Sequence, residues 1–133
     1  IHDVRASNIQ TFIDMLKKTG GGVEYENTSL RFYYKNQLSA TDVTTRIHPG
    51  FMTDWQAPWA VLMTQAEGIS TIHETVFENR FSYVEELRKL GANIDYFSPH
   101  VSNPHEIYQF NTLNEEKKRC QAIRIHGKTS LSQ

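Results

Sequence analysis

Two polar segments, His48-Pro-Gly-Phe-Met-Thr-Asp-Trp-Gln56 and Ile72-His-Glu-Thr-Val-Phe-Glu-Asn-Arg-Phe81, enclose an apolar stretch in the middle of the chain. Between them, residues 55–66 carry an apolar side chain on nearly every side of a predicted helix. A helix that is apolar all round is typical of a buried position. Because polar groups that bracket one buried segment can converge on one site, we expect the functional residues here.

The composition predicts a single domain, or part of one, of mixed helices and strands. The chain has 133 residues, a formal net charge of -1 and 22% charged residues. Both signs are interspersed, so neither a nucleic-acid partner nor a disordered acidic tail is indicated. The single cysteine, Cys120, excludes an internal disulfide and fits a reducing compartment. With no membrane-spanning run and no signal peptide visible, we expect a soluble, cytoplasmic protein with no membrane partner.

Periodicity and turn residues predict an α+β order of elements. Helices are expected over 7–18, 54–66 and 82–90, and strands over 23–26, 30–34, 42–47, 69–74, 94–97 and 122–126. Ser7 and Ser82 have the spacing of capping boxes, and glycines at 20–22, 68 and 91 are expected to end the helices. Residues 98–119 are polar, contain two prolines and are predicted to form a long inserted loop.

The chain also contains an internal repeat. Residues 13–25 match residues 84–96 at an offset of 71, and residues 29–39 match residues 122–132 at an offset of 93. These matches predict two copies of a helix–strand–strand unit, of which the second carries the inserted loop. The alternative is two generic helix–hairpin units that are similar by chance. If the repeat is genuine, the second copy stops before its counterpart of 41–54, and we expect the chain to be a piece of a larger protein.

Asp54 and Arg80 are the charged residues to which a function can be assigned from the pattern. Asp54 begins a helix, where it is either an ordinary N-terminal carboxylate or a base that takes a proton from a substrate hydroxyl. Arg80 lies between Phe77 and Phe81, where it either stabilises a turn or binds an anion. The pattern predicts an α+β repeat domain with a candidate anion site, without naming a reaction.

Metal and thiol chemistry are weaker alternatives. His48, His73 and Glu74 are metal-ligand types, but no HExxH or CxxC spacing is present, so we expect no metal. Basic residues at 117–119 could activate the thiol of Cys120. Since no defined base lies nearby in the sequence, an incidental thiol is the preferred interpretation.

Residues 48–57, 65–68 and 73–81 together resemble the UDP-N-acetylglucosamine enolpyruvyl (carboxyvinyl) transferases, and residues 86–92 continue the match. The resemblance covers nearly the whole chain and is weakest over 98–119. It implies a protein of two similar domains, each an inverted α/β barrel-like arrangement of three βαβαββ repeats around buried helices. Residues 1–133 would then be part of one such domain, about one complete repeat plus part of the next, with the second domain of the parent chain as a partner.

The resemblance implies transfer of the enolpyruvyl group of phosphoenolpyruvate to a hydroxyl of UDP-N-acetylglucosamine, with release of phosphate and without a cofactor. This reaction is the first committed step of bacterial peptidoglycan synthesis and passes through a tetrahedral intermediate. Asp54 matches the aspartate that contacts the sugar hydroxyl and is proposed as the base. Val76 matches the position whose backbone binds the UDP-sugar, Phe77 lies beside it, and Arg80 matches an arginine near the anionic ligands. Met52 stands where the family usually has proline.

Other parts of the family's site have no counterpart in this sequence. They are the Lys-Asn pair, the mobile loop with its reactive cysteine, and the later arginines. The isolated chain is therefore predicted to be inactive. Two alternatives stay open: an enolpyruvylshikimate-phosphate synthase, and a binding module without chemistry in which Asp54 and Arg80 are structural.

Overall fold

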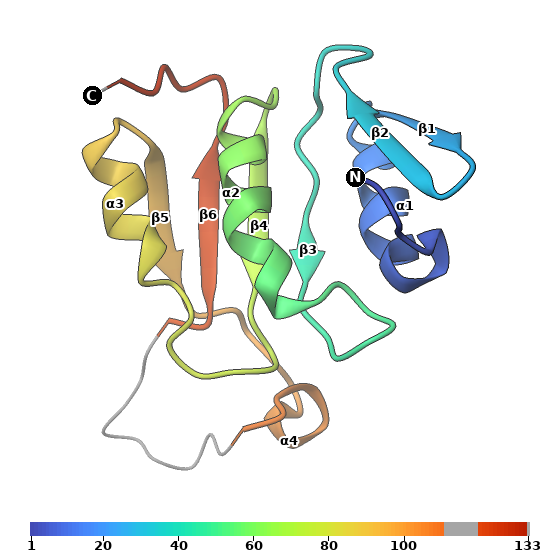
Figure 1. Ribbon diagram of the computed structural model, residues 1–133. Helices are drawn as coiled ribbons and strands as arrows, with labels where there is room; N and C mark the ends of the chain where they lie inside the picture. Colours follow the sequence, from blue (N-terminus) through green and yellow to red (C-terminus); the bar gives the residue numbers. More distant parts are fainter. Residues whose placement is uncertain (111–119, 133) are drawn as a thin grey trace.

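The computed structural model describes residues 1–110 and 120–132, which form a two-stranded and a four-stranded sheet with their helices (Figure 1). The first part consists of η1 (Ala6–Ile9), α1 (Gln10–Lys18), β1 (Gly22–Glu26) and β2 (Ser29–Tyr33). The remainder consists of β3 (Val43–Thr44), η2 (Thr53–Trp55), α2 (Gln56–Thr64), β4 (Ile69–His73), α3 (Tyr83–Lys89), β5 (Asn93–Phe97), α4 (Pro104–Ile107) and β6 (Ala122–His126). No helix within 1–110 or 120–132 is long and apolar enough to cross a membrane.

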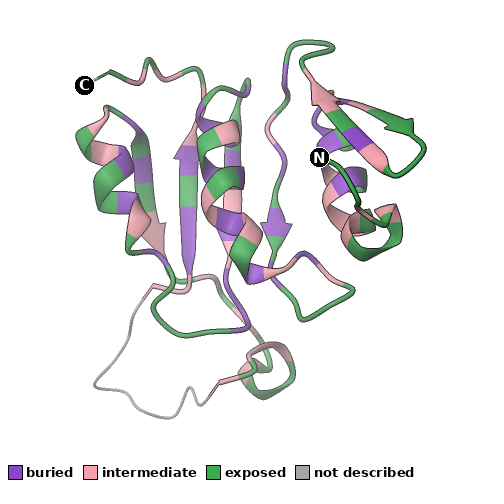
Figure 2. Ribbon diagram, viewed as in Figure 1, coloured by how far each residue is buried: buried purple, intermediate pink, exposed green. Residues whose placement is uncertain are grey.

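The four-stranded sheet has the order β3-β4-β6-β5, and α2 and α3 cover one of its faces (Figure 1). β3 runs parallel to β4, whereas β6 is antiparallel to both of its neighbours. Ile123 and Ile125 are buried under the helices, while Arg124 between them is exposed and lies between Thr71 and Asp95 on the opposite face (Figure 2). The sheet therefore has one apolar face towards the helices and one polar face.

The repeat predicted from the sequence is present as a repeated helix–strand–strand unit. Gly22 lies opposite Tyr33 in the β1–β2 pair, and Asn93 lies opposite His126 in the β5–β6 pair. The offsets of 71 and 93 residues thus relate the two hairpins down to their strand register. The first hairpin closes with a tight turn, whereas the second has a long connection that contains α4, a helix the sequence analysis missed. Residues 111–119 of the predicted inserted loop lie outside the described residues.

Several local predictions need correction. The strand expected over 42–47 is only Val43–Thr44. The Thr45 N–H still donates to the His73 carbonyl of β4, but the Arg46 N–H donates to the Phe51 carbonyl in a turn, so the pairing with β4 ends there. Neither capping box forms. Ser7 lies inside η1, and Ser82 has helical φ and ψ angles of -57° and -29° and makes no side-chain capping bond, since capping needs an extended backbone.

Glycine does end two of the helices as predicted. Gly20 and Gly91 have φ angles of 96° and 101° and follow α1 and α3 closely. This left-handed conformation is the one that glycine adopts without a steric penalty. Helix α2 ends earlier than predicted, at Thr64, and Gly68, with a φ angle of 107°, is the last residue of the connection to β4.

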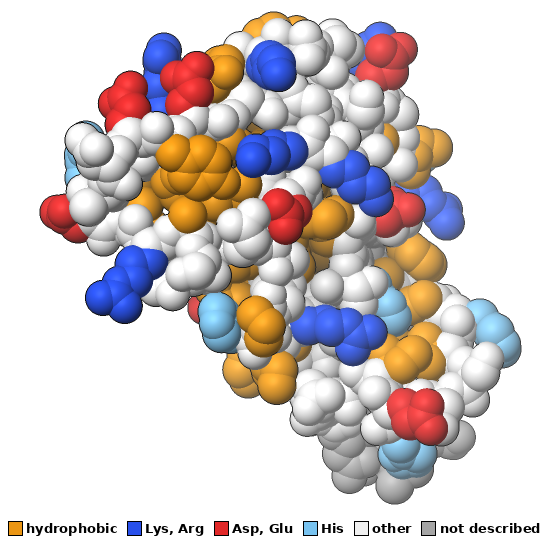
Figure 3. Space-filling model, turned by 90° about the vertical axis from the view of Figure 1, so that its right-hand side faces the viewer, with side chains coloured by type: hydrophobic (Ala, Val, Ile, Leu, Met, Phe, Trp, Pro, Cys, Tyr) orange, Lys and Arg blue, Asp and Glu red, His pale blue; other side chains and the backbone are white. Residues whose placement is uncertain are grey.

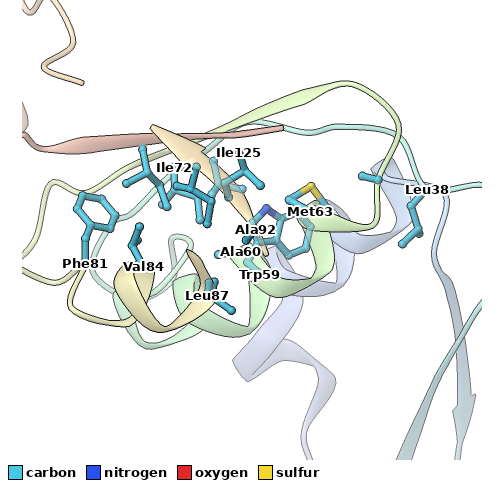
Figure 4. Packing of buried hydrophobic residues seen from close by; sticks show 14 of the residues in the cluster. Leu38, Trp59, Ala60, Met63, Ile72, Phe81, Val84, Leu87, Ala92 and Ile125 are labelled. Carbon is cyan, nitrogen blue, oxygen red and sulfur yellow. The ribbon is translucent and has the colours of Figure 1, made fainter. Parts of the chain in front are cut away.

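Helix α2 is buried on one side, not on all sides as expected. Trp59, Ala60 and Met63 have no exposed surface, and Figure 4 shows them packed with Ile72 of β4 among the buried apolar residues. Val61, in contrast, is 42% exposed. Nothing in the described part of the chain covers that side of the helix, although its side chains are apolar.

A cluster of aromatic rings joins the first unit to α2. The Phe12 ring of α1 lies 6.0 Å from Phe32, 6.3 Å from Phe51, 5.5 Å from Trp55 and 5.8 Å from Trp59, measured between ring centroids. Most of these pairs are edge-to-face, the favourable arrangement for aromatic rings. Phe12 therefore links α1 and β2 to both ends of the segment that carries Asp54.

Replacing Phe12 by alanine should lower the free energy of unfolding by about 2–3 kcal/mol, because it removes the ring shared by these contacts while the site stays partly open to solvent. Urea denaturation followed by tryptophan fluorescence measures the change. Tyr34→Ala is the control: Tyr34 is 71% exposed, so its loss should change stability by less than about 0.5 kcal/mol. Equal effects of the two changes would contradict the role given to Phe12.

Candidate functional site

The two polar segments on either side of α2 meet in the structure. Asp54, in η2, accepts a hydrogen bond from Nη2 of Arg80, in the loop between β4 and α3, with 2.6 Å between nitrogen and oxygen. A pocket of about 310 Å³ opens beside this pair. It is lined by Thr53, Asp54, Gln56, Ala57, Asn79, Arg80, Ser82 and Tyr83. Residues far apart in the sequence thus form one polar concavity.

The Asp54–Arg80 pair is open to solvent. The side chain of Asp54 is 79% exposed and that of Arg80 is 41% exposed. An exposed ion pair of this kind contributes only about 0–1 kcal/mol, so either partner can exchange the other for a ligand at little cost. The Arg80 guanidinium also lies 5.6 Å from the centroid of the Phe77 ring, which is 53% exposed. Three of the four predicted site residues therefore lie side by side at the surface.

Beneath this surface, the carboxylate of Glu74 holds the loop that follows β4. Glu74 is fully buried. Its Oε1 accepts hydrogen bonds from the Val76 N–H at 2.6 Å, the Phe77 N–H at 3.0 Å and the Thr45 hydroxyl at 2.9 Å. Val76, the fourth predicted site residue, is itself buried, so its position depends on this carboxylate.

The other oxygen of Glu74 holds the segment that carries Asp54. Oε2 accepts a hydrogen bond from the Thr53 hydroxyl at 2.6 Å and another from the Gln56 side-chain amide. Tyr83 of α3 completes the network by donating to Oε1 of Gln56 at 3.1 Å. Burial, with a further contribution from Glu74, raises the pKa of the Tyr83 hydroxyl, so this residue stays a neutral donor. One buried carboxylate thus joins the segment that carries Asp54 to the loop that leads to Arg80.

The sequence analysis missed this role of Glu74, which it weighed only as a metal ligand beside His73. A signal was present: in a strand, alternate residues share a face, and Glu74 is in phase with the buried Ser70 and Ile72. Within 1–110 and 120–132 no group of three His, Cys, Asp or Glu side chains is arranged to hold a metal. Cys120 is a half-buried free thiol, and its basic neighbours at 117–119 lie outside the described residues.

Similarity to solved structures defines the class of the fold. The enolpyruvyl transferase NikO from Streptomyces tendae superimposes with a TM-score of 0.70 over 94% of this chain and 24% of that chain, at 21% sequence identity. The chain therefore has a mixed α+β fold of the enolpyruvyl transferase type.

Sequence similarity then gives the family. Residues 1–116 match the model of EPSP synthase (3-phosphoshikimate 1-carboxyvinyltransferase), and the chain belongs to this family of carboxyvinyltransferases. The UDP-N-acetylglucosamine 1-carboxyvinyltransferase of Chlamydia muridarum is 38% identical over 132 residues, which are 98% of this chain and 28% of that protein. The protein of the same name from Protochlamydia amoebophila is 45% identical over 91 residues, 68% of this chain and 20% of that protein. The resemblance seen in the sequence is confirmed for the family, and the chain spans less than a third of these relatives.

Glu74→Gln should lower the free energy of unfolding by about 1–3 kcal/mol. The reason is that an amide N–H₂ would replace one of two oxygens that face only donors. Glu78→Gln is the matched control, because Glu78 is exposed in the same loop, and it should be neutral within about 0.5 kcal/mol. Denaturation midpoints of the two variants test this. A Glu74→Gln variant as stable as Glu78→Gln would show that the network does not depend on the carboxylate.

Met52→Pro should raise the free energy of unfolding by about 0.4–1 kcal/mol, the gain from restricting the unfolded chain. The φ angle of Met52 is -68°, which is the value that a proline ring imposes. Among the described residues, none accepts a hydrogen bond from the Met52 N–H. Met52→Ala separates the backbone effect from loss of the side chain. A proline variant less stable than the alanine variant would contradict the prediction.

Proposed function

We propose that this chain is part of a bacterial enolpyruvyl transferase that moves the enolpyruvyl group of phosphoenolpyruvate to a hydroxyl of UDP-N-acetylglucosamine. Membership of the carboxyvinyltransferase family supports the reaction type. The Chlamydia muridarum relative, which matches 98% of the chain, supports the acceptor. The observation that carries the proposal is the exposed Asp54–Arg80 pair beside a pocket, on two segments joined by one buried carboxylate.

In this proposal Asp54 is the base. Its exposed carboxylate takes the proton of the sugar hydroxyl while the hydroxyl oxygen adds to C2 of phosphoenolpyruvate and C3 gains a proton. The tetrahedral intermediate then loses a C3 proton and inorganic phosphate, which leaves the enolpyruvyl ether. Arg80, released from Asp54, pairs with an anionic group of a substrate, as guanidinium groups do with carboxylates and phosphates.

Val76 and Phe77 contribute their backbone. Both N–H groups are already used by Glu74, so contact with the UDP-sugar falls to the carbonyl groups, which accept hydrogen bonds. Phe77 offers an exposed ring on which a planar or apolar part of the ligand can pack. No cofactor enters this scheme.

The arrangement of the sheet supports a place for the chain in a larger domain. Helices lie on one face of the sheet and charged residues such as Arg124 and Asp95 on the other, as expected for an inverted α/β barrel with the sheet outside. We assign 1–133 to one such domain, with about one complete βαβαββ repeat plus part of another, and 98–119 to an insertion. The exposed Val61 side of α2 then faces the other repeats.

The second domain of the parent chain supplies the opposite wall of the cleft. The enzyme works in the cytoplasm, at the first step of peptidoglycan synthesis.

A shikimate phosphate is the alternative acceptor, because the description of the family names it. Phosphate release by the whole parent protein, measured with phosphoenolpyruvate and each acceptor in turn, separates the two. We expect release with UDP-N-acetylglucosamine and none with shikimate 3-phosphate. The reverse result would assign the chain to the other activity.

The 133-residue chain alone should release no phosphate above the blank, since it lacks the reactive-cysteine loop. Turnover by the pure chain would refute this expectation.

Asp54→Asn in the parent protein should lower kcat by about 10²–10⁴, the usual contribution of a positioned base. Asp95→Asn is the control: Asp95 is an exposed carboxylate on β5, paired with His126 on the face away from the helices, and its loss should leave kcat within about twofold. Near-normal turnover of Asp54→Asn would favour the structural interpretation of Asp54. Rates are measured at saturating substrate.

A further inference from the structure

The segment 104–110, which follows β5, contacts the end of β4 at two points. The Tyr108 hydroxyl lies 2.9 Å from Nε2 of His73, and the two rings meet edge to face with 5.4 Å between centroids. The Gln109 N–H donates to the Thr75 carbonyl at 2.8 Å. These contacts join parts of the chain that are more than thirty residues apart. They come from the long connection for which the sequence analysis found no role.

Thr75 is the first residue of the 75–80 loop, which carries Val76, Phe77 and Arg80. It is 1% exposed. On one side, the Thr75 N–H donates to the Thr45 hydroxyl at 2.8 Å. On the other side, its carbonyl oxygen receives the Gln109 N–H. Because a buried carbonyl without a donor is unfavourable, the contact with Gln109 stabilises the observed position of the loop.

The contact between Tyr108 and His73 joins two neutral groups. Burial lowers the pKa of His73; the nearby Arg46 acts in the same direction and Glu74 in the opposite one. Burial raises the pKa of the Tyr108 hydroxyl. Near neutral pH a neutral imidazole therefore faces a protonated phenol. The hydrogen bond between Tyr108 and His73 does not require either side chain to be charged.

We propose that the 104–110 segment is a brace for the 75–80 loop, and that Tyr108 and Gln109 are positioning residues for substrate binding. The brace acts through the Thr75 carbonyl and His73, which flank Glu74 on the chain. It thereby holds in place the Val76 and Phe77 N–H groups that Glu74 binds. The effect on the loop stands by itself, whereas the effect on substrate binding rests on the function proposed above.

Hydrogen exchange of the Val76 and Phe77 amides in the whole parent protein tests the brace without any substrate. Gln109→Pro removes the N–H that Thr75 accepts. The preceding residue, Tyr108, already has φ and ψ angles of -88° and 134°, which a following proline favours. Gln109→Ala keeps the N–H and removes only an exposed side chain. We expect exchange about three- to tenfold faster in the proline variant, the size of one net hydrogen bond, and unchanged exchange in the alanine variant.

Kinetics of the same variants give a second measurement. Gln109→Pro should raise KM for the acceptor about three- to tenfold and leave kcat within about twofold, because the brace positions the binding loop and does not take part in proton transfer. Tyr108→Phe keeps the ring and loses the bond to His73, so it should shift exchange and KM in the same direction by a smaller factor.

Equal amide exchange in Gln109→Pro and Gln109→Ala would overturn the brace. If the proline variant does not fold, unchanged exchange at Val76 and Phe77 in Tyr108→Phe overturns it instead. Faster exchange in a parent protein that turns over neither acceptor would support the brace and refute the proposed function, so the two failures are distinguishable.

Discussion

The structure depends on one buried carboxylate. Glu74 has no exposed surface, and a charge in that position is strongly unfavourable unless donors surround it. The donors come from three separate parts of the chain: Thr45 after β3, Thr53 and Gln56 at the start of α2, and the N–H groups of Val76 and Phe77. Each of these parts is irregular or the end of an element. The carboxylate therefore joins the end of β3, the start of α2 and the loop after β4 at one point.

Around Glu74, the buried packing interactions lie in a different place from the solvent-exposed ion pair. The aromatic cluster of Phe12, Phe51, Trp55 and Trp59 and the apolar core hold α2 and its N-terminal turn by packing. The Asp54–Arg80 pair lies above them and is open to water. A site built in this way can change the partners of its charged groups at small cost while their backbone stays in place. Over the face seen in Figure 3, charges of both signs are interspersed among apolar side chains, so no broad field of one sign covers it.

The two helix–strand–strand units have the same strand pairing but different connections between their strands. Their strands pair in equivalent registers, but the first hairpin turns tightly at residues 27–28, whereas the second leaves the sheet and returns after a long connection. Lengthening a surface connection costs little entropy. The described part of this connection is used, because Tyr108 and Gln109 contact the end of β4 next to Glu74. A connection of this length thus gains contacts beside the candidate site without any change in the sheet.

The sequence by itself determined the two helix–strand–strand units, the glycine stops at Gly20 and Gly91, and the family. Those features depend on local periodicity, on backbone preferences of single residues and on long motifs, all of which can be read along the chain. Only the tertiary structure decided that Ser7 and Ser82 do not cap, that α2 is exposed at Val61, that Arg80 reaches Asp54 and that Glu74 joins the start of α2 to the loop after β4. Each of these results depends on which distant groups meet, and therefore on the packing of the whole chain. The sequence shows which hydrogen bonds a side chain can donate or accept, whereas the fold determines which group lies close enough to be its partner.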